Sequence, residues 1–190
     1  MPLRRSTPTL DLNLTRVEQV ALPSQSAVVT AFKSVNLADA FSIRLPSDAS
    51  RNPVVLARFI FAEQPSWIGA LIQLRDAIVA GLGLKTARHL ATLSGDATAP
   101  RIGIFRVFST SETEVVLGED DKHLDFRVSI LYTPGSPPTT GHQLTLSTVV
   151  HCHNRLGRAY LSVIAPFHRQ VVKASLRRAA HIGWPKAGTR

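Results

Sequence analysis

The feature that most limits the possible fold is a run of four segments between residues 101 and 154 in which apolar and polar side chains alternate. A period of two is typical of strands that bury one face. Turn-rich pieces such as GEDD and TPGSPPTTG separate the segments, so consecutive strands are expected to pair antiparallel. The four segments are RIGIFRVFS, ETEVVLG, KHLDFRVSILY and HQLTLSTVVHCHN, and a further strand is predicted over GRAYLSVIA at 157–165.

Before this run, the pattern changes from a strand to helices. LADAFSIRLP at 37–46 alternates like a strand and ends at a proline. Asn52 followed by Pro53 is typical of a helix cap and first helical position, and Ser66 offers a second cap. We therefore expect a short helix and then a longer one, whose apolar residues recur at helical spacing: Trp67, Leu71, Leu74, Ile78 and Leu82.

The C-terminal segment APFHRQVVKASLRRAAHI at 165–182 predicts a final helix, with Pro166 in its first turn. His168 would then lie near the helix start, held by packing or donating to a ligand or a carbonyl. Arg169, Lys173 and Arg177 lie four residues apart and predict a basic ridge. The inward stripe is expected to be Val171, Val172, Ser175, Leu176, Ala179 and Ile182.

The length of 190 residues suits one domain, which would bury roughly 70% of its unfolded surface. We expect this domain over residues 27–182, with an N-terminal extension at 1–26 and a tail at 183–190. The single cysteine excludes an internal disulfide, and the N-terminal residues lack the apolar core of a secretory signal. Together these two features favour a reducing cytoplasm. No apolar run reaches the ~20 residues of a membrane span, so we expect no such span.

The net charge of +9 comes entirely from residues 126–190, which hold nine basic residues and no acidic one. Such a basic end can steer a protein to nucleic acid, anionic lipid or an acidic partner, or can be a solvated face. No series of aromatic residues is interleaved with the basic ones, which argues against a nucleic-acid partner. The runner-up hypothesis for function is therefore an interaction module that binds an anionic partner through this basic C-terminal third.

Four ordered blocks carry a family resemblance: PSWIGALIQLRDAIVAGLGLK, IGIFRVFS, VVLGEDDKHLDFRVSILY and NRLGRAYLSVIAPFHRQVV. They are similar to the signature blocks of a bacterial domain-of-unknown-function family in the START and Bet v 1-like (SRPBCC) superfamily, over residues 27–181. The resemblance implies an α+β helix-grip fold, in which a curved antiparallel sheet wraps around a long C-terminal helix, with two helices after the first strand.

The resemblance also implies an apolar cavity between the sheet and the last helix. Relatives in the wider superfamily bind lipids, sterols or polyketides there, and some catalyse cyclisation or hydrolysis. The preferred hypothesis is therefore binding of a small apolar molecule, with no cofactor. The expected lining residues are Trp67, Leu71, Phe126, Val128, Val150, Tyr160 and Phe167, and the polar groups that could reach inside are Arg106, Tyr132 and Tyr160.

The cluster His151, Cys152 and His153 suggests either a metal site, a Cys-His nucleophile or a strand that contains histidines. On a strand, Cys152 points to the opposite face from its two neighbours, which argues against a local dyad or a clamp of adjacent ligands. Cys152 is then expected to be a small apolar-face residue.

Pairing of the two neighbouring strands offers a second arrangement for these histidines. Matching their apolar faces sets Phe126 opposite Val150, which brings Asp125 opposite His151 and His123 opposite His153. This gives a titratable cluster of His123, Asp125, His151 and His153 that could hold a metal, although its spacing matches no standard zinc pattern.

No G-x-S-x-G, P-loop or dinucleotide fingerprint is present, so the sequence assigns no reaction. An exposed sheet edge could pair with a second copy in a homodimer.

Overall fold

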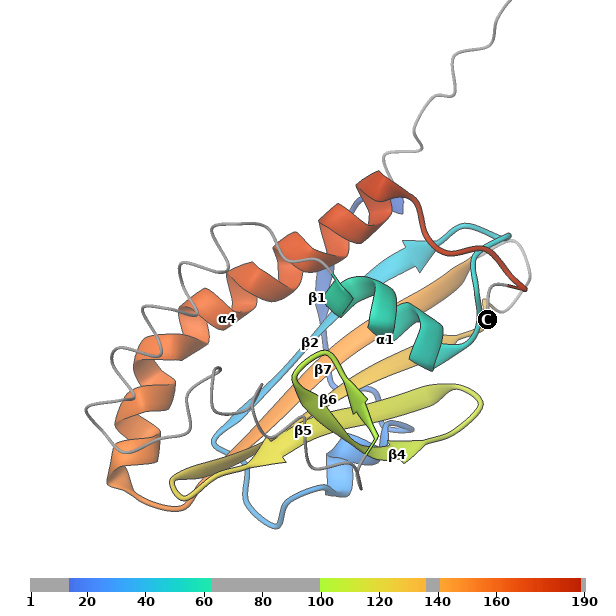
Figure 1. Cartoon of the computed structure of the whole chain (residues 1–190). Coiled ribbons are helices and arrows are strands. Elements are labelled where there is room, and N and C mark those ends of the chain that lie inside the picture. Colours follow the sequence, from blue (N-terminus) through green and yellow to red (C-terminus); the bar gives the residue numbers. More distant parts are fainter. Residues whose placement is uncertain (1–13, 63–99, 136–140, 189–190) are drawn as a thin grey trace, which may run out of the picture.

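The alternating segments form the strands of one curved antiparallel sheet, and the C-terminal segment forms a long helix across it (Figure 1). The computed structural model describes residues 14–62, 100–135 and 141–188. The predicted α+β class, with a curved antiparallel sheet and a long C-terminal helix, is confirmed. The strands are β1 (Glu18–Val20), β2 (Leu37–Leu45), β3 (Arg101–Ile102), β4 (Phe105–Thr110), β5 (Glu114–Asp120), β6 (Leu124–Thr133) and β7 (His142–Cys152), in the sheet order β1-β2-β7-β6-β5-β4-β3.

The register between β6 and β7 is the one that the apolar faces predict. Phe126 pairs with Val150, and Asp125 pairs with His151. A shift by one residue would turn every apolar side chain of β7 to the other face, so the alternation specifies the register. At the end of the ladder, the His153 N–H donates to the His123 carbonyl over 2.9 Å, which sets these two histidines opposite each other.

The short helix α1 (Pro53–Ala62) follows β2, as the sequence predicts. The Asn52 side-chain oxygen accepts from the backbone N–H groups of Val54 and Val55, at 2.9 and 3.3 Å, and Pro53 is the first helical residue. These two acceptor contacts satisfy N–H groups that have no partner within the helix. The longer helix predicted after Ser66 lies outside the described residues.

The strand predicted over 101–109 is wrong in one respect, because it is divided into β3 and β4. Gly103 has φ of +60°, a conformation that glycine adopts without steric cost, and the chain turns there. Ile102 then pairs antiparallel with Phe105. The result is a tight hairpin at the edge of the sheet rather than one longer strand.

The strand predicted over 157–165 is wrong, because these residues are the first part of α4 (Arg155–Ile182). The Asn154 side chain accepts from the Gly157 N–H, and the helix starts at Arg155, eleven residues before Pro166. Pro166 lies inside α4 and is exposed, so water can satisfy the carbonyl that a proline leaves without a donor. His168 is therefore in the middle of the helix and not in its first turn.

The face of the sheet that α4 and α1 cover contains the main apolar core. Phe41 and Ile43 of β2, Leu117 of β5, Ile130 of β6 and Leu144 of β7 are among its almost fully buried members. Val172, Leu176 and Ala179 of α4 pack against them. Within the described ranges, no helix has both the length and the hydropathy that a membrane span requires.

Segments predicted as a terminal extension and a tail also contact the domain. β1, within the predicted extension, pairs with β2. After α4, Trp184 is buried, the Ser50 N–H donates to the Pro185 carbonyl over 2.6 Å, and the Ala187 N–H donates to the Asp48 carbonyl over 2.9 Å.

The opposite face of the sheet is covered by the 3₁₀ helix η2 (Ala27–Thr30), which packs Val28 against Val116 and Val149. Glu114 of β5 holds η2 there: its carboxylate accepts from Ser26 Oγ at 2.5 Å, from Ser129 Oγ at 2.5 Å and from the Ala27 N–H at 3.0 Å. Because Glu114 is buried, these donors supply the contacts that water would give an exposed carboxylate.

We expect Glu114→Gln to lower the free energy of unfolding by about 1–3 kcal/mol. The amide nitrogen of glutamine is a hydrogen-bond donor, and in this buried site it would face groups that also donate. Urea denaturation measures the change. Glu112→Gln is the matched control, because Glu112 is exposed two residues away, and it should change stability by less than about 0.5 kcal/mol. Equal effects for the two variants would contradict the assigned role of Glu114.

We also expect Gly157→Ala to lower the free energy of unfolding by about 1–3 kcal/mol through overpacking. A Cβ at residue 157 would lie 2.2 Å from the His123 carbonyl oxygen, where the first turn of α4 approaches the start of β6. Alanine is otherwise the better helix former, so a loss of stability would report the clash alone. Chemical denaturation of G157A beside S162A, which changes an exposed residue of the same helix, tests this; a stabilised G157A would refute it.

Candidate functional site

Two polar side chains interrupt the apolar face of the sheet at the same position along neighbouring strands. On β2, Asp39 lies between Leu37 and Phe41 on the face toward α4. Its partner in the register is Thr148 of β7. The side chain of Asp39 is only 1% exposed, and Thr148 is 3% exposed. The sheet therefore presents a buried carboxylate beside a buried hydroxyl to the inner face of the helix.

The helix contributes two basic side chains at this position. Arg169 Nε donates to Asp39 Oδ2 at 3.3 Å. His168 Nε2 lies 3.5 Å from the other carboxylate oxygen, Asp39 Oδ1, without forming a hydrogen bond. Residues 168 and 169 lie one turn before Val172, where the main core begins on α4. Arg169 therefore fixes one oxygen of Asp39 and leaves the other directed toward His168.

Three buried polar atoms of this group have no hydrogen-bond partner: Asp39 Oδ1, Thr148 Oγ1 and His168 Nε2. Buried polar atoms in native proteins are almost always hydrogen-bonded, and each exception needs a physical reason. Asp39 Oδ1 can only accept when the carboxyl is ionised, whereas a hydroxyl and an imidazole nitrogen can donate or accept. We refer to Asp39, Thr148, His168 and Arg169 as the polar gap.

The polar gap separates two apolar clusters beneath α4. The main core lies on one side, with Leu146 of β7 and Val172 of α4 nearest to the gap in sequence. A smaller cluster lies on the other side, toward the start of α4. Its buried members are Leu124, Val150, Cys152 and Tyr160, and Leu37, Phe126, Leu161 and Ile164 pack against them.

The residues that were expected to line a cavity fall into three groups. Phe126, Val128 and Val150 lie on the sheet face toward α4, Tyr160 lies on α4 itself, and all four lie in or against the two clusters on either side of the polar gap. Trp67 and Leu71 lie outside the described residues, so the cavity itself stays a prediction.

Of the other three expected residues, Tyr132 lies on the same face of the sheet as Val128, whereas Phe167 and Arg106 do not point into this core. Phe167 is 45% exposed on α4. Arg106 is exposed, with its guanidinium 5.1 Å from the centre of the Phe108 ring, and Phe108 packs on the η2 face of the sheet. Tyr132 is buried in the main core and its hydroxyl lies 2.8 Å from His142 Nδ1.

The four residues of the hypothetical metal cluster are opposite one another as the register requires, but only the His153 and Asp125 side chains pair with each other. His153 Nε2 lies 3.1 Å from Asp125 Oδ1. His151 Nδ1 lies 3.0 Å from Ser34 Oγ. In the parts of the chain that are described, no three histidine, cysteine, aspartate or glutamate side chains are grouped so that they could hold a metal.

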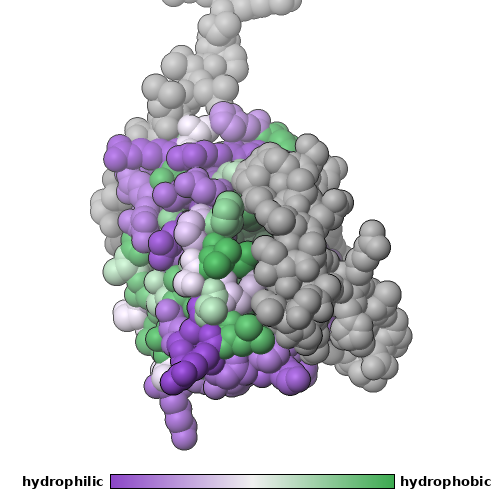
Figure 2. Space-filling view, turned by 90° about the vertical axis from the view of Figure 1, so that its left-hand side faces the viewer, coloured by the Kyte–Doolittle hydropathy of each residue, from purple (hydrophilic) through white to green (hydrophobic). Residues whose placement is uncertain are grey.

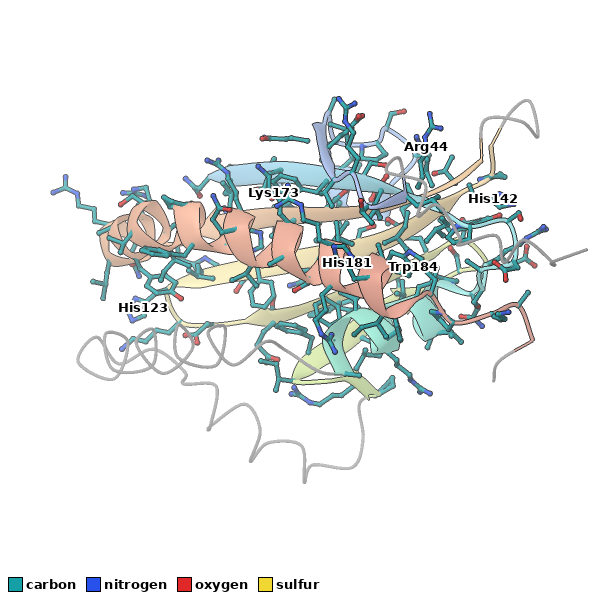
Figure 3. All side chains as sticks on the ribbon, turned by 90° about the horizontal axis from the view of Figure 1, so that it is seen from above. Arg44, His123, His142, Lys173, His181 and Trp184 are labelled. Atoms are coloured by element: carbon teal, nitrogen blue, oxygen red, sulfur yellow. The ribbon has the colours of Figure 1, made fainter. Side chains whose placement is uncertain are left out.

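His123 is separate from the other histidines. It lies beside the start of α4 (Figure 3), and its Nδ1 is 2.9 Å from the Asn154 side-chain nitrogen. Its Nε2 is buried without a hydrogen-bond partner. His123 thus belongs to the contact between β6 and the helix cap.

Comparison with known proteins gives one family. The family model described as "Protein of unknown function (DUF2867)" matches residues 31–175, most of the chain. The chain belongs to this family. No curated protein and no solved structure matches it. The residues matched in this DUF2867 protein include the whole polar gap, from Asp39 on β2 to Arg169 on α4.

Sequence reasoning about this DUF2867 protein missed Asp39 and did not connect it to Thr148. The signal was present as two breaks in apolar stripes: Asp39 is in phase with Phe41, and Thr148 is in phase with Leu146 and Val150. The pairing of β2 with β7 was needed to place the two breaks together.

Cys152 is buried on the face toward α4, away from His151 and His153, as strand alternation predicts. Burial raises the pKa of the Cys152 thiol above its ordinary value, and the positive charge of Arg158 lowers it by a smaller amount. The thiolate is the reactive form, so a raised pKa disfavours nucleophilic chemistry at neutral pH.

We therefore expect native DUF2867 protein to react with a disulfide reagent such as Ellman's reagent at least about tenfold more slowly than the same chain in denaturant, because the folded thiol is less ionised and less accessible. The rate of release of the coloured thiolate at neutral pH measures this. The unfolded chain is its own control, because it has the same single cysteine. A native rate equal to or above the unfolded rate would show an activated cysteine and contradict the expectation.

Proposed function

We propose that this protein binds a small, largely apolar molecule that carries a hydroxyl or amine group, held between the sheet and the inner face of α4. The observation that supports this most directly is the group of three unpartnered polar atoms in the polar gap, Asp39 Oδ1, Thr148 Oγ1 and His168 Nε2. A ligand that supplies the missing hydrogen bonds would remove the cost of leaving these atoms buried without hydrogen bonds.

The chemistry of the polar gap defines the polar end of the ligand. An ionised Asp39 carboxylate needs a donor at Oδ1, because Arg169 already occupies Oδ2. A hydroxyl or a protonated amine of the ligand would donate to Oδ1. A hydroxyl would then have lone pairs that could accept from Thr148 Oγ1 or His168 Nε2, whereas a carboxylate or phosphate ligand would be repelled by Asp39.

The smaller apolar cluster suits the other end of the ligand. Phe126 and Ile164 pack at its boundary and are only partly buried, while Val150 and Tyr160 are buried. An apolar body placed among them would add contacts without leaving polar groups unpaired. This agrees with the small apolar ligand that the sequence suggested and adds a polar group to it.

Native mass spectrometry of the gently purified protein, followed by solvent extraction, tests the proposal. We expect a bound molecule of low mass that contains a hydroxyl or amine. The absence of any extractable molecule from wild-type protein, combined with no binding from a library of hydroxylated and aminated apolar compounds, would overturn the proposal.

Thr148→Val tests the role of the Thr148 hydroxyl most directly, because valine keeps the shape of threonine and removes only the hydroxyl. We expect ligand affinity to fall about tenfold, the loss of roughly one hydrogen bond. Stability without ligand should stay unchanged or rise by up to about 1 kcal/mol, since the buried hydroxyl has no partner there. Isothermal titration calorimetry and urea denaturation measure the two quantities.

Thr145→Val is the matched control on the same strand. Thr145 is buried on the opposite face of the sheet and donates to Ser42 Oγ at 3.4 Å. We expect this control to lower stability and to leave ligand affinity unchanged. If Thr148→Val lost stability and kept its affinity, Thr148 would be a structural residue and the proposed site would be wrong.

A further inference from the structure

The outer side of α4 has an unusual charge composition. The helix contains Arg155, Arg158, Arg169, Lys173, Arg177 and Arg178, and it contains no acidic residue. Arg169 donates a hydrogen bond to Asp39. The Lys173 side-chain nitrogen lies over the ring of Phe41, 5.3 Å from its centre. Arg155, Arg158 and Arg177 are exposed. A long, positively charged helix surface therefore faces solvent.

The same surface exposes two large apolar side chains. Val163 is 53% exposed and Phe167 is 45% exposed. At 100° per residue, these two residues together with Arg155 and Arg177 fall within about one third of the helix circumference. On the side of the molecule along which α4 runs, hydrophobic and hydrophilic surfaces adjoin (Figure 2).

The start of α4 carries its positive charges where they destabilise the helix. Arg155 is the first helical residue and Arg158 follows in the next turn, while the first turn contains no acidic side chain. The helix dipole places partial positive charge at this end, so acidic residues are favoured there and basic ones are not. An external anionic group would offset this repulsion.

We propose that the outer side of α4 docks on an anionic lipid bilayer. Arginine side chains would contact lipid phosphates, and Val163 and Phe167 would enter the boundary between headgroups and acyl chains. A nucleic acid would use the same charges, but it has no apolar layer to receive a valine beside a phenylalanine. The apolar pair therefore favours a bilayer, and this docking does not depend on a ligand in the polar gap.

Co-sedimentation of the full chain with extruded vesicles tests the proposal. We expect binding to phosphatidylcholine vesicles that contain phosphatidylglycerol, weak binding to phosphatidylcholine alone, and release by high salt. The R155E/R177E variant should bind at least about 25-fold more weakly, because each basic residue near an anionic surface contributes roughly fivefold. The V163S/F167S variant should bind about tenfold more weakly at unchanged charge.

The R51E/R58E variant is the matched control, because it makes the same change of charge at exposed residues before and within α1. It should keep most of the binding, and circular dichroism should show all variants folded. Equal losses of vesicle binding by the control and by R155E/R177E would show that binding depends only on the net charge of the protein, and would overturn the proposal. So would binding of short duplex DNA together with no binding to vesicles, or full vesicle binding by V163S/F167S.

Discussion

The packing of α4 across one face of the sheet is the interaction on which the rest of the structure depends. Each end of the helix is fixed by a different device. At the start, Asn154 caps the helix and Gly157 lets it approach the His123 carbonyl. At the end, Gly183 adopts φ of +98° and is followed by the buried Trp184, whose ring centre lies 6.1 Å from that of Phe59 in α1. Both termini of α4 are therefore held to other elements, and its middle must lie over the sheet.

In the middle of this contact, the polar side chains of the polar gap interrupt the apolar packing between α4 and the sheet. Asp39, Thr148 and His168 bring together three polar atoms that form no hydrogen bond, between two apolar clusters. An unsatisfied buried polar group costs about 1–3 kcal/mol, which is a large share of the stability of an ordinary domain. A sequence selected for stability alone would place apolar residues at these positions. Departures from local consistency of this kind are expected at functional sites.

The sequence was sufficient for the parts of the fold that depend on periodicity within a segment. The alternation in β6 and β7 predicts their register, and Asn52 with Pro53 predicts the start of α1. The segment 157–165 was assigned wrongly because Tyr160, Val163 and Ile164 are residues that strands also favour, and Pro166 resembled a helix start. The cap at Asn154 would have corrected this, since Asn154 precedes Gly157, Tyr160 and the rest of the inward helical stripe.

The polar gap could not be found in the same way, because it is assembled from distant parts of the chain. Asp39 and Thr148 meet only because β2 lies beside β7 in the sheet, and no local pattern predicts that neighbour. The sequence indicates His168 as a candidate donor to a ligand, but it does not indicate the partner of His168 on β2. A break in an apolar stripe is informative only when the strand that faces or pairs with it is known.

The contact of Arg169 with the sheet and the positive charge of the outer side of α4 both follow from one property of its sequence. The helix contains no acidic residue. Since no carboxylate on the helix can pair with Arg169, its partner must come from the sheet, and Asp39 is buried beneath α4 as a result. On the outer side, Arg155 and Arg158 oppose the helix dipole at a cost of about 0.3–1 kcal/mol each, which the cap at Asn154 offsets. Because Asp39 already binds Arg169 and the exposed Arg155 and Arg177 take no part in that contact, charge reversal at Arg155 and Arg177 leaves the contact between Arg169 and Asp39 in place. The proposed ligand binding and the proposed bilayer docking can therefore be tested separately, and a variant that loses one of them should keep the other.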